Sequence, residues 1–201
     1  MKVGEVNKEN VKKIADTGYI KLYDLNYRND DHYYFVSRKD ENNLAIKKNA
    51  KQLTECIPDG VGCILIVNGK LYLNCEYRLP IGQYTLSVPA GLIENQEDIF
   101  TAAKREIKEE TGLEVSKIEM ACPLMFSSPG LTDESNAMVI AYCDDITKAN
   151  QNNCEDSECF NGYLLMEPEE IRNILNKTCA DNYNFYSVYT VIAMLYYLTL
   201  K

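Results

Sequence analysis

The sequence contains a single histidine, His32, and none of its eight cysteines belongs to a CxxC pair. Cys154 and Cys159 are the nearest two cysteines, and no histidine stands close to them. Structural zinc sites combine closely spaced cysteines and histidines, so this pattern argues against such a site. We therefore expect reduced, partly buried thiols in a cytosolic protein.

The chain also has little positive charge and no long apolar run. Its net charge of -9 argues against a large interface with a nucleic-acid backbone. Residues 1–10 contain no apolar core of a secretory signal, and the apolar run from Val188 to Leu200 is too short to span a membrane. We expect a cytoplasmic protein without nucleic-acid or membrane partners, which can still bind a small anion through local arginines and a metal ion.

Two β-rich segments follow a polar lead-in at the N-terminal end. Residues 1–15 are expected to be frayed or weakly helical, and residues 42–53 are ambiguous. Residues 19–23 and 32–38 are rich in tyrosine and β-branched side chains and are separated by the turn residues 29–31. The pattern predicts a hairpin or small sheet that stands before the main domain.

The rest of the chain alternates strands and helices. A strand at 61–67, a type I′ turn at Asn68-Gly69 and a returning strand at 70–77 open the main domain. On the closing helix, the residues expected to face the core are Val188, Val191, Ile192, Leu195 and Leu198. The remaining strands are expected at 84–88, 114–122, 136–143 and 163–166, and the helices at 98–111, 168–176 and 184–201.

The stretch from Gly91 to Leu113 carries the clearest chemical signal. Residues 98–111 are rich in helix formers, and Gly112 follows where a helix needs a left-handed terminal residue. At about 100° per residue, Glu106, Glu109 and Glu110 share an arc of roughly 100° at the edge of the apolar stripe. Carboxylates crowded at a core edge repel one another, and a bound hard cation such as Mg²⁺ would relieve that repulsion. A solvated acidic helix paired with lysines is the alternative, but Lys104 and Lys108 lie outside this arc.

The same stretch resembles the Nudix box. The nine fixed positions of the box are met by Gly91, Glu97, Arg105, Glu106, Ile107, Glu109, Glu110, Gly112 and Leu113. The resemblance implies an α/β (α+β) fold, a Nudix α/β/α sandwich with a mixed sheet, here preceded by a small N-terminal antiparallel β-segment. It also implies hydrolysis of a nucleoside diphosphate linked to another moiety, with Mg²⁺ or Mn²⁺ held by the box glutamates.

Further segments resemble the ADP-ribose pyrophosphatase subgroup of that family. Pro129 lies sixteen residues beyond Leu113, where the subgroup has a proline. The runs Tyr77–Gly82, Pro89–Glu94 and Val36–Arg38 are also similar. One position departs from the subgroup, because Ser87 stands where a glutamate is common two residues before the Pro-Ala-Gly sequence. The missing carboxylate could alter the number of metal ions or the substrate range.

The resemblance assigns roles to individual residues of the box. Glu106, Glu110, Glu109 and the carbonyl of Ala90 are the candidate metal ligands. Arg105 is the candidate catalytic residue that orients the carboxylates, and Glu97 is expected to pair with it. Glu134 is the candidate general base, and Glu109 and Asp133 are its rivals.

Substrate-binding roles fall on the flanking segments. Arg78 and Arg38 are candidates for the diphosphate and for the terminal ribose or adenine. Tyr33 is the candidate for stacking on adenine, Tyr34 or Tyr23 could replace it, and Pro129 marks the subgroup's loop. We expect residues 1–57 to form an N-terminal dimerisation segment, residues 58–201 to form the Nudix domain, and the protein to be a homodimer with shared active sites.

Three other functions compete with hydrolysis of ADP-ribose. A Nudix hydrolase for a different nucleotide sugar or dinucleotide would use the same box. A binding module that senses ADP-ribose without cleaving it would be expected to lack box glutamates, and none is missing here. A hydrolase for RNA ends would call for a basic surface, which the net charge of -9 disfavours.

Overall fold

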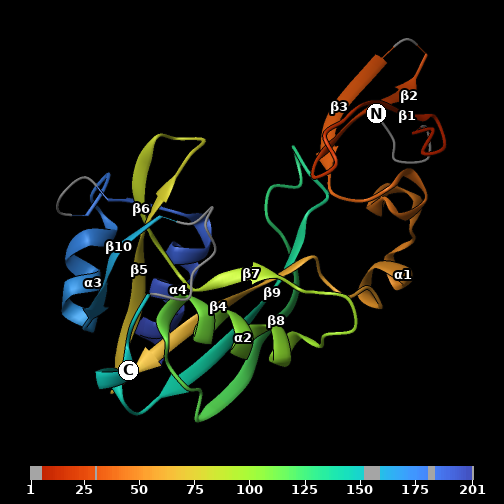
Figure 1. Cartoon of the computed structure of the whole chain (residues 1–201). Helices are drawn as coiled ribbons and strands as arrows, with labels where there is room; N and C mark the ends of the chain where they lie inside the picture. The colour runs from red at the N-terminus through yellow and green to blue at the C-terminus, as the bar shows by residue number, and fades with distance from the viewer. Residues whose placement is uncertain (1–5, 30, 152–158, 181–183, 201) are drawn as a thin grey trace. The chain divides into compact units, whose positions relative to one another are not determined.

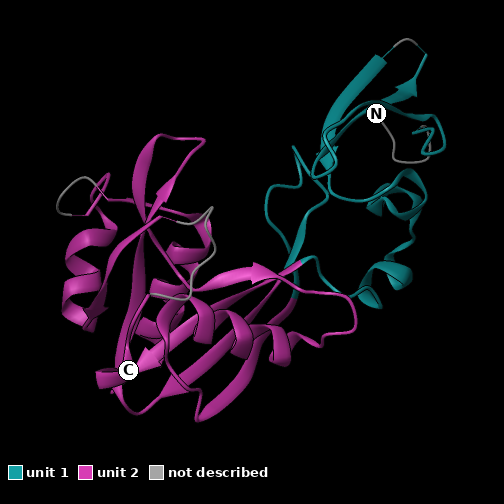
Figure 2. Cartoon of the chain, viewed as in Figure 1, with its two compact units in different colours: residues 1–59, 124–136 teal, residues 60–123, 137–201 magenta. Residues whose placement is uncertain are grey.

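The computed structural model describes residues 6–29, 31–151, 159–180 and 184–200. The chain divides into two compact units, which are treated separately below (Figure 2). The N-terminal unit comprises residues 1–59 together with 124–136, and the second unit comprises residues 60–123 and 137–201. The sequence predicted a boundary between residues 57 and 58 but assigned the 124–136 loop to the Nudix domain.

The N-terminal unit is built on a three-stranded antiparallel sheet. The predicted hairpin is formed by β2 (Lys21–Arg28) and β3 (Asp31–Ser37), and Tyr23 and Leu25 of β2 are buried in a small core with Leu44. A third strand, β1 (Val11–Asp16), pairs with β2, although the sequence suggested a frayed or weakly helical lead-in for residues 1–15. Only Val11 of β1 is buried, so backbone pairing forms this strand without the alternating hydrophobic pattern that would have revealed it.

The segment between β3 and the end of the N-terminal unit at Asp59 has no long helix or strand. It contains two 3₁₀ turns, Glu41–Asn43 and Ala45–Lys47, and the five-residue helix α1 (Ala50–Thr54). A reciprocal pair of hydrogen bonds between Asn49 and Gln52 caps α1. The 124–136 loop returns to β3, where the backbone N–H of Val36 donates to the carbonyl of Leu131 at 2.9 Å.

The larger sheet is mixed, as the sequence predicted (Figure 1). Its strand order is β11-β6-β5-β4-β9-β8, while β10 also pairs with β5 and β7 also pairs with β4. The β11–β6 pair is parallel, whereas β5–β6 and β4–β5 are antiparallel. The strands are β4 (Gly60–Val67), β5 (Lys70–Arg78), β6 (Gln83–Ser87), β7 (Ala90–Leu92), β8 (Lys117–Phe126), β9 (Ser135–Cys143), β10 (Phe160–Met166) and β11 (Phe185–Tyr186).

Helices cover both faces of this sheet. Every residue of β4 is buried, and its odd-numbered side chains pack against Ala103 and Ile107 of α2 (Ile99–Thr111). Ile64 and Ile66 alternate with these side chains and are buried as well, and α4 (Val188–Thr199) also contacts β4, β5 and β6. Helix α3 (Pro168–Leu175) begins at Pro168 as expected and packs against α4. The arrangement confirms the predicted fold class.

The expected core face of α4 is wrong. The buried residues are Thr190, Ala193, Met194 and Tyr197, whereas Val188 is 56% exposed and Leu195 is 52% exposed. Thr190 donates to the carbonyl of Leu86 at 2.5 Å, and the hydroxyl of Tyr197 donates to the carbonyl of Gly69 at 2.6 Å. The helix has no charged residue, so hydrophobicity alone does not determine which face is buried. The face with Thr190 and Tyr197 is turned inward because their hydroxyls donate hydrogen bonds to these two carbonyls.

Within the described ranges, no helix combines the length and apolar character needed to cross a lipid bilayer.

Candidate active site

A close approach between backbone and carboxylate defines the centre of the candidate site. Asp98 caps the start of α2 through hydrogen bonds from the backbone N–H groups of Phe100 and Thr101, and Gly112 ends it with φ 72°. The helix places Glu106 against the chain at Gly91, where a Cβ atom would lie 2.0 Å from Oε1 of Glu106. Only glycine allows the backbone and this carboxylate to share the space.

Arg105 holds the acidic residues of the box together. Its Nε and Nη2 atoms donate to the two oxygens of Glu97, each at 2.9 Å, which forms the predicted pair. Its Nη1 atom donates to Glu106 at 2.8 Å and to Glu109 at 3.0 Å. Hydrogen bonds from Arg105 hold the pKa of Glu97 below its usual value, and those with Glu97 raise the pKa of Arg105. The guanidinium therefore stays charged and fixes three carboxylates in one geometry.

Glu110 lies on the inner side of the same helix and is held separately. It is 4% exposed, and its Oε1 atom accepts a hydrogen bond from the backbone N–H of Ala90 at 3.0 Å. Its Oε2 atom accepts one from the side-chain amide of Asn74 at 2.5 Å. Asn74 was not predicted as a site residue, although an amide between the apolar residues Leu73 and Cys75 of a buried strand was a detectable signal.

These residues fit a divalent cation in their donor chemistry. Glu106, Glu109 and Glu110 supply carboxylate oxygens, and two of them lie against the Ala90-Gly91 backbone. In the described ranges no three acidic, thiol or imidazole side chains converge into a preformed metal cage. Arg105 draws Glu106 and Glu109 into ion pairs, while Ala90 and Asn74 hold Glu110, so binding of a cation would require these contacts to be shared.

The polar side chains of β5 and β6 extend from Glu110 toward solvent. Ser87, which departs from the subgroup, is buried directly opposite Asn74 in the β5–β6 pair and contacts Thr85 at 2.9 Å. Arg78, a predicted substrate ligand, is about half exposed and pairs with the buried Glu76 at 2.8 Å. Glu76 is a second residue that the sequence analysis missed.

The remaining predicted site residues gather in the N-terminal unit. The hydroxyl of Tyr33 donates to the carbonyl of Gly130 at 2.5 Å, next to Pro129. Arg38 donates to Glu134 at 3.0 Å, so the candidate base is paired with a candidate substrate ligand. A hollow of about 320 Å³ has apolar and aromatic walls. Its lining residues are Leu25, Tyr33, Phe35, Ala45, Ile46, Phe126, Pro129, Thr132 and Asp133.

Asp59, which was not predicted as a site residue, and Asp133, a rival candidate for the general base, brace the loop around Glu134. Oδ2 of Asp59 accepts hydrogen bonds from Lys39 at 2.5 Å and from the backbone N–H and hydroxyl of Ser135 at 2.8 and 2.9 Å. Asp133 accepts one from the backbone N–H of Ala45 at 2.9 Å. The residues on both sides of Glu134 are thus anchored, which explains why this loop belongs to the N-terminal unit.

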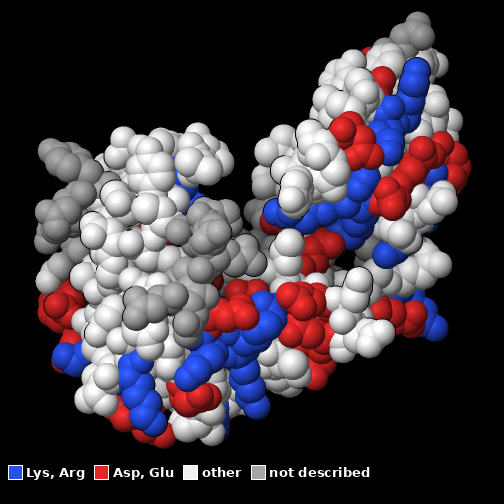
Figure 3. Space-filling model, in the orientation of Figure 1, with Lys and Arg blue, Asp and Glu red and all other residues white. Residues whose placement is uncertain are grey.

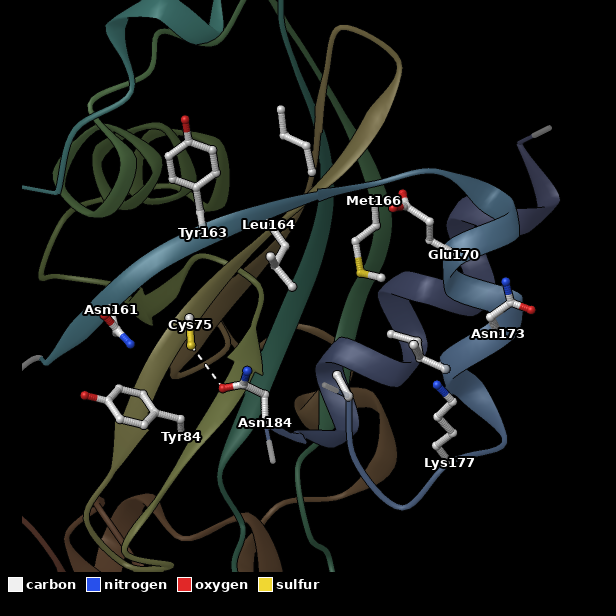
Figure 4. Close-up of a pocket in the computed structure, with 13 residues that line it drawn as sticks. Cys75, Tyr84, Asn161, Tyr163, Leu164, Met166, Glu170, Asn173, Lys177 and Asn184 are labelled. Carbon is white, nitrogen blue, oxygen red and sulfur yellow. Dashed lines mark hydrogen bonds between the residues drawn. The ribbon is translucent and has the colours of Figure 1, made fainter. Parts of the chain in front are cut away.

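The second unit has a larger cavity on its β10–α3 side (Figure 4). Its volume is about 670 Å³, and none of the described residues that line it belongs to the Gly91–Leu113 stretch. Tyr84, Tyr163, Asn161 and Asn184 surround it, and the thiol of Cys75 donates to Asn184 at 3.0 Å. Without carboxylates of the box, this cavity lacks the chemistry expected for metal-assisted hydrolysis.

Charged side chains of both signs lie on the surface, whereas an uncharged thiol is buried beneath the acidic helix. On the face shown in Figure 3, basic and acidic side chains are interspersed on each unit. Beneath the helix, burial raises the pKa of the Cys63 thiol well above its usual value, and the nearby Glu110 and Glu106 carboxylates add to the effect. Cys63 is therefore held as a neutral thiol under the acidic side chains.

The fold is an α/β/α sandwich, and its candidate site is an acidic helix packed against a glycine, as in a metal-dependent hydrolase. Comparisons with known proteins agree with that class. The family model described as NUDIX domain matches residues 57–188, and the chain belongs to the Nudix family.

Individual relatives are similar over part of the chain. A Caenorhabditis elegans protein whose name places it among nudix hydrolases is 42% identical over 112 residues, covering 54% of this chain and 50% of that protein. The ADP-ribose pyrophosphatase of Saccharomyces cerevisiae is 36% identical over 125 residues, covering 56% of this chain and 54% of the yeast protein. The matched region thus spans about half the length of these relatives.

A solved structure supports the fold over nearly the whole chain. The crystal structure of an ADP compounds hydrolase superposes with a TM-score of 0.59, covering 92% of this chain and 88% of that chain. The sequence identity is 19%, so this likeness supports the fold alone.

Proposed function

We propose that this protein hydrolyses the diphosphate linkage of ADP-ribose, or of a related nucleoside diphosphate sugar, in a metal-dependent reaction. Cleavage of ADP-ribose would yield AMP and ribose 5-phosphate. The observation that carries the proposal is the close contact between the Glu106 carboxylate and Gly91, together with the hydrogen bond from the backbone N–H of Ala90 to Glu110. A structural acidic helix has no need for such contacts, because its glutamates can turn to solvent.

The residues of the Nudix box would have separate roles in the reaction. Glu106, Glu110, Glu109 and the carbonyl of Ala90 would hold Mg²⁺, and the same oxygen donors also suit Mn²⁺. When bound, the ion supplies positive charge that neutralises the diphosphate oxygens during displacement. Arg105 keeps Glu106 and Glu109 aligned through its hydrogen bonds.

The substrate assignment is supported by the relatives and by residues outside the box. One relative is named ADP-ribose pyrophosphatase, and a mouse protein named ADP-sugar pyrophosphatase is 35% identical over 80 residues. Arg78 and Arg38 have guanidinium groups that suit phosphate oxygens, and Tyr33 and Pro129 line an apolar hollow that suits a flat ring. We propose that these four residues bind the nucleoside diphosphate sugar.

Glu134 is the proposed general base. In the reaction it would take a proton from the attacking water as the water oxygen bonds to phosphorus and the bridging P–O bond breaks. Asp133 is a weaker candidate, because one of its carboxylate oxygens is bound to the backbone at Ala45. Glu109 remains a rival, because its side chain is 45% exposed and so can contact water.

We also propose that the protein is a homodimer, as the resemblance implies, and that it is cytoplasmic, as the pattern of its cysteines indicates. The short three-stranded sheet of the N-terminal unit would be the dimerisation element. Size-exclusion chromatography with light scattering would test this, since a monomeric mass at micromolar concentration would contradict it. A variant lacking residues 1–38 should then lose the dimer.

The decisive experiment is a substrate panel with product separation. Purified protein with Mg²⁺ is incubated with ADP-ribose, ADP-glucose, NADH, a diadenosine polyphosphate and a GDP-sugar. Glu110→Gln tests the acidic helix, and Glu114→Gln is a matched control because that acid lies beyond the end of α2, is largely exposed and pairs with Lys108. We expect AMP chiefly from ADP-ribose, a loss of at least about 100-fold for Glu110→Gln, and little change for Glu114→Gln.

Other outcomes separate the competing functions. If another sugar or dinucleotide is cleaved best, the box chemistry stands and the assignment of Tyr33, Arg38 and Pro129 fails. If ADP-ribose binds but no substrate is cleaved, the protein is a sensing module. The base is tested by Glu134→Gln, which should lower kcat with little change in KM and remove the acidic limb of the pH–rate profile.

A further inference from the structure

Asn74 stands out as a buried amide beside the acidic helix. Its side chain is fully buried in the middle of β5, where a polar group is costly unless it is hydrogen-bonded. The Nδ2 atom donates to Oε2 of Glu110 at 2.5 Å, while the backbone N–H of Ala90 donates to Oε1. Each oxygen of the Glu110 carboxylate therefore accepts a hydrogen bond, and the plane of the carboxylate is fixed.

A second amide sets the orientation of Asn74. The Nε2 atom of Gln151 donates to Oδ1 of Asn74 at 3.0 Å. Because an amide presents oxygen on one side and N–H on the other, this contact turns the N–H of Asn74 toward Glu110. The reverse orientation would place two oxygens against each other. The three side chains form a directed series of hydrogen bonds, from Gln151 to Asn74 to Glu110.

The partner of Asn74 across the sheet explains why a neutral donor suits this place. Asn74 lies directly opposite Ser87, the position at which the resembling subgroup commonly carries a glutamate. Ser87 is buried and contacts the hydroxyl of Thr85, so this pair of opposite positions carries no carboxylate. A neutral amide can align Glu110 without adding negative charge to a buried position.

We propose that Asn74 is the positioning residue for Glu110, and that Gln151 keeps Asn74 in its donating orientation. The inference rests on the proposed function, because it assigns Asn74 to the metal affinity of the acidic helix. Asn74 does not touch substrate in this role. It holds a ligand in the geometry that a cation needs, and partners of this kind typically contribute about 10- to 100-fold in metal affinity.

The test is a titration with Mn²⁺ alone, followed by electron paramagnetic resonance, on the full chain without substrate. Asn74→Leu keeps the number and branching of the heavy atoms and removes the donor, and Gln151→Leu leaves the donor but releases its orientation. Thr85→Val is the matched control, because it removes a buried hydroxyl of the neighbouring strand whose hydrogen bonds go to the carbonyl of Glu76 and to the hydroxyl of Ser87. We expect the Kd for Mn²⁺ to rise about 10- to 100-fold in Asn74→Leu, by less in Gln151→Leu, and not at all in Thr85→Val.

Circular dichroism melts show which variants are folded at the titration temperature. If Asn74→Leu is unfolded, Gln151→Leu carries the test, because Gln151 is only partly buried. If the folded variants bind Mn²⁺ with wild-type affinity while Glu110→Gln is impaired, the positioning role is overturned and the proposed function stands. If Glu110→Gln itself binds Mn²⁺ like the wild type, the metal role of the helix fails, and the inference about Asn74 fails with it.

Discussion

Gly91→Ala is the substitution that most directly tests the geometry of the acidic site. A Cβ atom at this position would lie 2.0 Å from Oε1, 2.1 Å from Cδ and 2.4 Å from Oε2 of Glu106. Since real Cβ contacts are essentially never shorter than 3.0 Å, the carboxylate must move by about 1 Å or more. The carboxylate is the end of a flexible side chain, so the displacement is possible, but it breaks the 2.8 Å hydrogen bond to Arg105.

The expected effects on stability and activity differ in size. Losing a hydrogen bond between charged groups costs about 1.5–3 kcal/mol, and replacing glycine by alanine returns about 0.4–1 kcal/mol by restricting the unfolded chain. The net loss is about 1 kcal/mol or somewhat more, which lowers Tm by about 2–4 °C per kcal/mol in a chain of this size. A ligand displaced by about 1 Å can reduce turnover about 100-fold, equivalent to about 2.7 kcal/mol of transition-state stabilisation.

The assay pairs the rate of AMP release from ADP-ribose with a thermal melt of the same sample. Gly62→Ala is the control, because Gly62 lies on β4 opposite Ala90 and the nearest atom to its added Cβ would be the flexible end of Met138 at 3.3 Å, followed by Val88 at an ordinary 3.7 Å. Both variants gain the same methyl group, but only one displaces Glu106. Wild-type activity in Gly91→Ala, or an equal loss in Gly62→Ala, would refute the reasoning.

Three further predictions follow from the same structure. Arg105→Lys should reduce activity about 10- to 100-fold, because a lysine cannot reproduce the forked contacts to Glu97. Its Tm should be lower than that of the wild type at neutral pH and should converge with it as the pH falls through the lowered pKa of Glu97, because protonation removes the stabilising contribution of that carboxylate. Gly112→Ala should lower the free energy of unfolding by about 1–2 kcal/mol, because φ is 72° and the added Cβ would lie 2.3 Å from the Asn150 amide. An unchanged midpoint of urea unfolding would contradict this helix end. At pH 8 the Cys63 thiol should react with a maleimide much more slowly than the exposed Cys159 thiol, because Cys63 is buried and burial raises its pKa. Mass spectrometry of the labelled peptides measures both rates, and equal rates would contradict the burial of Cys63.

Local patterns in the sequence were sufficient for much of the second unit. The Asn68-Gly69 turn, the start of α3 at Pro168 and the end of α2 at Gly112 follow from backbone preferences that act over a few residues. The pairing of Arg105 with Glu97 was also predictable, because a fixed spacing within one motif brings the two groups together. The box assigned the family for the same reason, since its positions lie in one continuous stretch.

Contacts between distant segments needed the tertiary structure. Asn74 is 36 residues from Glu110, and no local pattern indicates that its amide reaches that carboxylate. The anchoring of the Glu134 loop by Asp59 likewise joins segments 76 residues apart at Ser135. Strand β1 was missed because pairing with β2, rather than a hydrophobic alternation, stabilises it.

Helix α4 shows most clearly what each level decides. The sequence alone determined that residues near the C-terminal end form an apolar helix, because no charged side chain interrupts the run. It did not determine which side of that helix faces the sheet, since apolar residues occur all around it. The tertiary structure decided the rotation, because Thr190 and Tyr197 reach carbonyl groups on the sheet that only the folded chain brings within hydrogen-bonding distance.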